Sequence, residues 1–127
     1  MIAISNTSPL IILVKSGYLK NLQRIFKHVI IPEAAFNEIF RKEDLAGRRI
    51  NELIDAEFIE TKRIRNRELA DFINREVGLG ETEAIVLSLE LKPDYLLVDD
   101  YKARIYAEER SIKVIGTLGL IAENSGF

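Results

Sequence analysis

The chain has 127 residues, of which 47% are apolar and 30% charged, with a net charge of −2 and no cysteine. This size and composition predict one globular domain over residues 1–127 and exclude a disordered chain. The lack of cysteine excludes disulfides and thiolate metal sites, and it favours a cytoplasmic protein. The longest apolar run, residues 10–14, is too short to cross a bilayer, so no membrane partner is expected.

Short apolar runs alternate with helical patterns along the whole chain. In chain order we expect a strand at 2–5, helices at 9–16 and 19–26, a strand at 28–31, helices at 32–40 and 45–54, an edge strand at 58–61, helices at 69–77 and 81–91, a strand at 95–98, a helix at 101–110, a strand at 113–115 and a helix at 118–124. This alternation predicts a three-layer α/β/α fold with a mostly parallel sheet. Ligands of such sheets bind beyond the carboxyl ends of the strands, where the strand order reverses.

Local signals refine some of these elements. Ser8 suits the N-cap of the first helix and Pro9 its first turn. Phe40 falls on the apolar face of the helix at 32–40, and Tyr18 falls at an apolar position. We therefore expect Phe40 and Tyr18 to pack in the core. His28 begins an apolar strand and is expected to be structural.

Oxygen-bearing side chains follow strands or lie near helix starts at four places. They are Asn6, Glu38, Glu81, Glu83, Asp99 and Asp100. Because the carboxyl ends of parallel strands meet at one edge, we expect these side chains to converge there. Carboxylates that share a site repel one another, and Mg²⁺ or Mn²⁺ relieves the repulsion. Such a cation can activate water and offset charge on a phosphodiester.

Each of these side chains also has a plainer, structural interpretation. Asn6 alone is more readily explained as a helix cap, and Glu81 and Glu83 as acids favoured at a helix N-terminus. Glu38 alone is explained as a solvated helix flank. The basic run at 62–67 could contact phosphates, but a solvated loop is the simpler hypothesis.

Five segments together resemble the PIN-domain family, in particular its branch of short PIN-like proteins. They are Ser5-Asn6-Thr7-Ser8-Pro9-Leu10-Ile11, Val29-Ile30-Ile31-Pro32 followed by Glu38, Gly78-Leu79-Gly80-Glu81-Thr82-Glu83-Ala84-Ile85, Leu96-Leu97-Val98-Asp99-Asp100 and Val114-Ile115-Gly116-Thr117-Leu118-Gly119. The resemblance spans nearly the whole chain and is weakest between about 41 and 75.

The resemblance implies a Mg²⁺- or Mn²⁺-dependent endonuclease for single-stranded RNA. Such proteins are often the toxin of a toxin–antitoxin pair, so the implied partners are RNA, a cognate antitoxin and, as a homodimer, a second copy. The implied acidic quartet is Asn6, Glu38, Glu83 and Asp100, with Glu81 and Asp99 as supporting or alternative metal ligands. Ser8 and Thr117 stand where the family has supporting residues near the site.

Asn6 departs from the family pattern, in which the residue after the first strand is usually Asp. Asn6 keeps a carbonyl oxygen but loses the charge, which weakens metal binding by roughly a few kcal/mol. Two hypotheses follow: a nuclease that relies on its remaining acids, or a catalytically weakened module that binds nucleic acid or protein. A receiver-type phosphoacceptor domain ranks lower, because it needs an acid pair after strand one and a lysine after the last strand.

Overall fold

The computed structural model describes residues 1–41 and 43–125, with the backbone alone for residues 123–125. Within these residues the chain forms five strands and eight helices. The strands are β1 (Ile2–Ser5), β2 (His28–Pro32), β3 (Ile59–Lys62), β4 (Tyr95–Leu97) and β5 (Val114–Ile115). The helices are α1 (Thr7–Ser16), α2 (Leu19–Ile25), α3 (Glu33–Phe40), α4 (Leu45–Asp55), α5 (Arg67–Ile73), α6 (Leu79–Leu91), α7 (Tyr101–Glu108) and α8 (Thr117–Ser125).

The sheet is parallel throughout, in the order β3-β2-β1-β4-β5. β1 lies in the middle, with Ile4 opposite both Ile30 of β2 and Leu96 of β4. The strand order therefore reverses between β1 and β4, which is where a ligand site is expected in such a sheet. A receiver-type domain would have the order 2-1-3-4-5, so that alternative is excluded.

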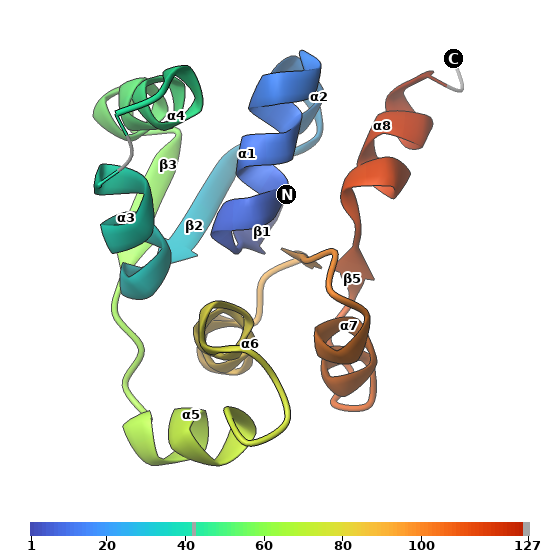
Figure 1. Ribbon diagram of the computed structural model, residues 1–127. Helices are drawn as coiled ribbons and strands as arrows, with labels where there is room; N and C mark the ends of the chain where they lie inside the picture. Colours follow the sequence, from blue (N-terminus) through green and yellow to red (C-terminus); the bar gives the residue numbers. More distant parts are fainter. Residues whose placement is uncertain (42, 126–127) are drawn as a thin grey trace.

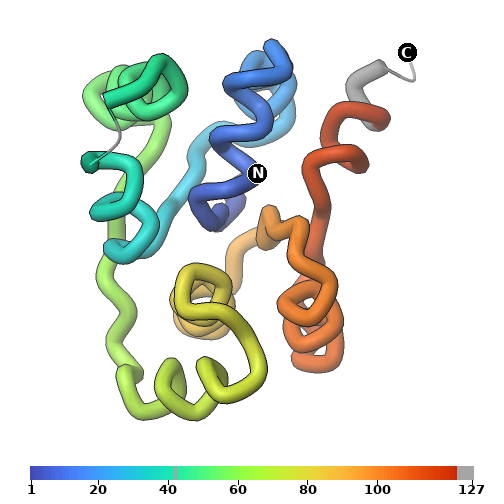
Figure 2. The backbone as a smooth tube through the Cα atoms, in the orientation of Figure 1, coloured from blue at the N-terminus to red at the C-terminus, as the bar shows by residue number. Residues whose placement is uncertain are grey.

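Two hydrophobic clusters cover the two faces of the sheet and confirm the three-layer architecture. α1, α2, α3, α4 and α8 pack on one face, and α5, α6 and α7 pack on the other (Figures 1 and 2). α6 is the most deeply buried helix, because every residue from 82 to 88 is buried. This explains why its sequence is apolar almost without a break, and it makes any charged residue in that stretch conspicuous.

Three local expectations are wrong. Ser8 is not the N-cap residue, since α1 starts at Thr7 and Asn6 occupies the N-cap position. Pro9 allows this start, because proline is tolerated throughout the first turn, where N–H groups lack intrahelical partners. Phe40 is 68% exposed at the end of α3, where it contacts the ring of Phe36 instead of the core. Tyr18 is 40% exposed between α1 and α2.

Gly17 ends α1 as expected. It adopts a left-handed conformation, with φ of 83°, and its N–H closes the last turn. No helix within the described ranges combines the length and the hydrophobicity that a membrane crossing requires.

Candidate functional site

Buried polar side chains gather at the carboxyl edge of the sheet. The described residues include eight that are polar or charged and buried, and six of them lie at strand ends or helix starts on this edge. The six are Ser5, Asn6, Thr7, Thr82, Glu83 and Thr117. Glu83 is the one ionisable side chain in the set, and at 5% exposed it is desolvated on a helix that is otherwise core. Burying polar groups is costly, so their concentration here makes this edge the candidate functional site.

Asn6 lies at the centre of this edge and is 5% exposed. Its side chain makes no capping hydrogen bond to α1, so its interpretation as a helix cap is wrong. The Oδ1 atom is fully buried and accepts no hydrogen bond from any residue that the structure describes. A Cβ atom added to Gly80 would lie 3.0 Å from this oxygen, so the Asn6 side chain lies against the first turn of α6.

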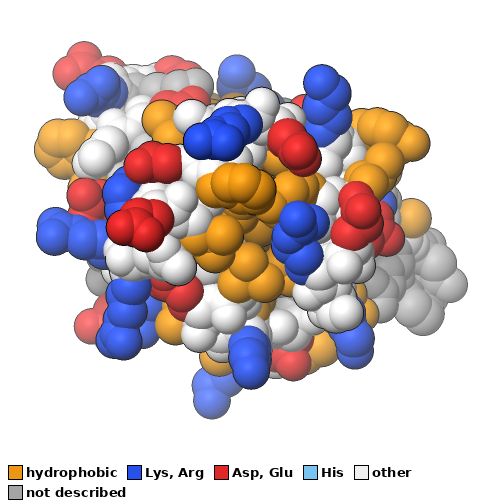
Figure 3. Space-filling model, turned by 90° about the horizontal axis from the view of Figure 1, so that it is seen from below, with side chains coloured by type: hydrophobic (Ala, Val, Ile, Leu, Met, Phe, Trp, Pro, Cys, Tyr) orange, Lys and Arg blue, Asp and Glu red, His pale blue; other side chains and the backbone are white. Residues whose placement is uncertain are grey.

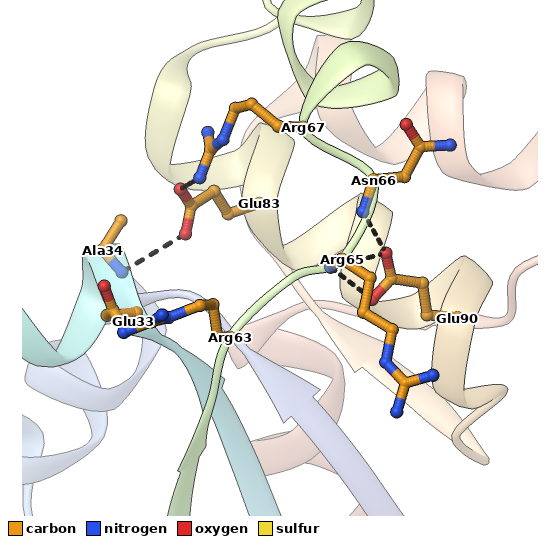
Figure 4. A network of polar contacts seen from close by, with 8 residues as sticks. All are labelled: Glu33, Ala34, Arg63, Arg65, Asn66, Arg67, Glu83 and Glu90. Carbon is orange, nitrogen blue, oxygen red and sulfur yellow. Dashed lines mark hydrogen bonds and ion pairs between the residues drawn. The ribbon is translucent and has the colours of Figure 1, made fainter.

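Glu83 lies one helical turn beyond Gly80, on the same face of α6. Its Oε2 accepts a hydrogen bond of 2.9 Å from Nη2 of Arg67, and its Oε1 accepts one of 3.3 Å from the backbone N–H of Ala34 (Figure 4). The Glu83 side chain is 7% exposed and that of Arg67 is 54% exposed. Arg67 therefore provides the counter-charge of a buried carboxylate while remaining open to solvent.

Sequence reasoning missed Arg67, which falls at the end of the basic run interpreted as a solvated loop. The structure instead holds this segment in place: the Glu90 carboxylate accepts hydrogen bonds from the backbone N–H groups of Arg65 and Asn66 (Figure 4). The Asn66 side chain caps α5 by accepting from Leu69 N–H. The sequence carried no signal for this role, because the helix was expected to begin only at residue 69 and the structure begins it at Arg67.

Asp99 and Thr117 meet at the loops that follow β4 and β5. The backbone N–H of Thr117 donates to Asp99 Oδ1 at 2.7 Å, and the Thr117 hydroxyl donates to Asp99 Oδ2. A Cβ atom on Gly116 would lie 3.1 Å from both Asp99 Oδ1 and Arg104 Nη1, so both side chains lie against Gly116. Asp99 thus ties the two loops together.

Asp100 and Ser8 lie on the outside of the same edge. Asp100 is exposed and caps α7, since its Oδ2 accepts a 3.0 Å hydrogen bond from Ala103 N–H. Ser8 is exposed in the first turn of α1. Asp100 therefore has a structural role that the sequence did not reveal.

Glu81 and Glu38 contribute less to the buried part of the edge. Glu81 reaches back over Gly78, where an added Cβ atom would lie 2.7 Å from Glu81 Oε2, as a capping-box glutamate does at a helix start. Glu38 is exposed on α3, and among the described residues no hydrogen bond or ion pair joins it to another candidate. Asn6, Glu83, Asp99 and Thr117 are thus the predicted residues that the fold brings to the edge most directly.

The side chains at this edge offer the atom type that a hard divalent cation prefers, but they are not arranged around a cation site. They are oxygen atoms, which Mg²⁺ and Mn²⁺ prefer, and Asn6 Oδ1 is a buried acceptor without a donor. Among the side chains that the structure describes, those of residues 1–41 and 43–122, however, no three from Asp, Glu or His form a group that could hold a metal ion. Protein donors instead engage Glu83, Asp99 and Asp100.

His28 has the structural role expected for it, at the opposite end of the sheet. Its Nε2 lies 2.7 Å from Oε2 of Glu60 on β3. This hydrogen bond, with a smaller contribution from Lys62, holds the pKa of Glu60 below its usual value.

Comparisons with known proteins agree with this geometry. The DUF3368 family model, described as a PIN domain, matches residues 2–125. Among solved structures, a PilT N-terminus domain protein from the hyperthermophilic archaeon Sulfolobus solfataricus P2 is similar, with a TM-score of 0.62 and 16% sequence identity over 97% of this chain and 92% of that one. No protein with curated annotation is significantly similar to the chain.

Proposed function

Because the chain belongs to the PIN-domain family, whose members are generally nucleases, we propose that it is a divalent-metal-dependent endoribonuclease acting on single-stranded RNA. The observation that carries the proposal is the pairing of a buried carboxylate, Glu83, with a buried, unbonded amide oxygen, Asn6 Oδ1, on one face of α6. Both lie where the strand order reverses, at the usual ligand position of this sheet.

We assign Asn6, Glu83 and Asp100 as the metal ligands, with Glu38 as the fourth residue of the site. A bound Mg²⁺ or Mn²⁺ would offset charge on the phosphodiester and activate water. Glu81 at the start of α6, together with Asp99 and Thr117, supports the ligands: the Asp99–Thr117 hydrogen bonds fix the loop that carries Asp100. Ser8, exposed in the first turn of α1, is proposed as a further supporting residue.

The test is cleavage of labelled single-stranded RNA by the purified protein. We expect internal cuts with Mn²⁺ that EDTA abolishes, and loss of cutting in Glu83→Gln. Glu52→Gln is a matched control, because Glu52 lies on α4 in an exposed ion pair with Arg49. Equal activity in the parent and in Glu83→Gln would identify a contaminating nuclease and remove the proposal.

The residue at position 6 and the arrangement of the acids favour a second function. Asn6 lacks the charge of the usual aspartate, Arg67 neutralises Glu83, and the described part of the chain has no group of three acids ready for a metal. These observations favour a PIN-like module that binds nucleic acid or protein without cutting. RNA binding that is unchanged by EDTA, together with intact RNA after prolonged incubation with Mn²⁺, would support this function over the first.

For partners we propose a homodimer and, for a toxin, a cognate antitoxin protein. On the face seen from below, hydrophobic side chains gather between charged ones (Figure 3), and the exposed Phe72 of α5 and Tyr101 and Ile105 of α7 belong to helices on this side. A pocket between α7 and the segment that follows α5 has Val77 and Ile105 in its wall. Light scattering after size exclusion tests the dimer: a monomer at 100 µM, roughly the range of weak association, would reject it.

A further inference from the structure

We propose that Arg67 is a built-in counter-cation for Glu83, and that a divalent ion binds this site only by displacing Arg67. This inference rests on the proposed function, because it concerns how the same site takes its metal. It assigns a role to a residue outside the implied acidic quartet. It also explains why the side chains offer the oxygen atoms that a divalent cation prefers and yet are not arranged around a cation site.

The first step of the argument is the charge balance of Glu83. This carboxylate is 7% exposed on a helix segment that is buried from residue 82 to residue 88. A buried carboxylate needs an opposite charge and hydrogen-bond donors. Glu83 has one opposite charge, the guanidinium of Arg67, and two donors, Nη2 of Arg67 and the N–H of Ala34. The positive charge that a metal would bring is therefore already supplied by the protein.

The second step concerns Asn6. Its Oδ1 lies over the same face of α6, fully buried and without a donor among the described residues. An arginine held by Glu83 does not satisfy this oxygen, whereas a cation next to Glu83 would bring both a charge and a partner for it. The site with Arg67 in place is thus incompletely satisfied.

The third step concerns the ease of displacement. Arg67 makes one hydrogen bond to Glu83, through Nη2, and its side chain is 54% exposed. Its backbone is held independently, since Glu90 fixes the two preceding N–H groups and Asn66 caps α5. The guanidinium can therefore swing into solvent without unfolding α5, and water then solvates it.

The experiment measures Mn²⁺ affinity by calorimetry and by the electron paramagnetic resonance signal of free Mn²⁺, without RNA. We expect Arg67→Gln to bind Mn²⁺ about tenfold more tightly than the parent, within the usual range of coupling between two sites. Arg63→Gln is the matched control: it removes the same charge four positions earlier, from an exposed 2.9 Å ion pair with Glu33, and should bind like the parent. Arg67→Lys keeps the competing charge and should also bind like the parent.

The outcomes separate the inference from the proposed function. If the parent and Arg67→Gln bind Mn²⁺ equally well, the inference is wrong and a metal-dependent nuclease still stands. If neither binds Mn²⁺, both the inference and the metal-dependent function fail. Should Arg67→Gln not fold, Mg²⁺ titration of the parent followed at the Arg67 Nε–H resonance gives the answer: a resonance that stays fixed while Mg²⁺ binds overturns the inference.

Discussion

Asn6→Asp restores the charge that the family usually has after strand one, and its effect can be worked out from the structure. The substitution places a carboxylate on a side chain that is 5% exposed and whose Oδ1 has no donor within the described residues. The new group lies over the face of α6 that carries Glu83. Burial and the neighbouring carboxylate both raise the pKa of the new group.

The magnitude follows from that pKa. An increase of about two units corresponds to roughly 2.7 kcal/mol. Because the pKa is higher in the folded state than in the unfolded state, the variant should match the parent near pH 4 and lose stability as the pH rises through the folded-state pKa. At pH 8 we expect an unfolding free energy lower by about 2–3 kcal/mol without metal. Mn²⁺ at about 100 times its Kd should restore roughly 2.7 kcal/mol.

Urea denaturation followed by circular dichroism, at pH 4 and pH 8 with and without Mn²⁺, measures these changes. Asn21→Asp is the control, because Asn21 is 6% exposed on α2, away from the site. It should lose comparable stability at pH 8 without recovery in Mn²⁺. Equal recovery in both variants, or none in Asn6→Asp, would refute the placement of a cation beside Asn6.

Three further predictions concern stability. Thr117→Val removes a hydroxyl donor to an exposed carboxylate and should lower the unfolding free energy by about 1 kcal/mol in urea; no loss would mean that this hydrogen bond does not hold the two loops. Gly17→Ala should lower stability by about 1–2 kcal/mol because φ is 83°, while Gly119→Ala, in helical backbone with an ordinary 3.5 Å contact, should be neutral or gain up to about 1 kcal/mol; the reverse order of melting temperatures would contradict this. His28→Gln should cost about 0.5 kcal/mol at pH 6, because it removes the partly exposed hydrogen bond that lowers the pKa of Glu60. The cost should shrink as the pH falls through the folded-state pKa of Glu60, where this carboxylate is protonated; a cost independent of pH would assign His28 a packing role.

The pattern of strands and helices was enough to locate the candidate site. β1 and β4 are neighbours as expected for the switch point, so Asn6 and the Asp99 loop do share one edge of the sheet. The location of the edge could be predicted because the alternation of strands and helices depends on local sequence, and the handedness of the crossovers depends on general geometry. The same reasoning could not decide whether Asn6 caps a helix, since that depends on where the first turn of α6 packs against it.

The partners of the acids could not be predicted, because they come from distant parts of the chain. Arg67 and Ala34 reach Glu83 across 16 and 49 residues, and Thr117 reaches Asp99 across 18. Each contact depends on how loops cross the edge of the sheet, which hydrophobic periodicity does not encode. The sequence therefore located the acids without showing that donors from distant parts of the chain already engage two of them, Glu83 and Asp99.

The hydrogen bond from Ala34 to Glu83 makes one backbone amide a natural probe of the site. Ala34 is the second residue of α3, where N–H groups lack intrahelical partners, and its N–H instead points at Oε1 of Glu83, 3.3 Å away. Its proton resonance and its exchange with solvent should therefore follow the charge and position of that carboxylate. A single amide signal in a ¹⁵N-labelled sample would then report what occupies Glu83, arginine or metal, without substituting either residue.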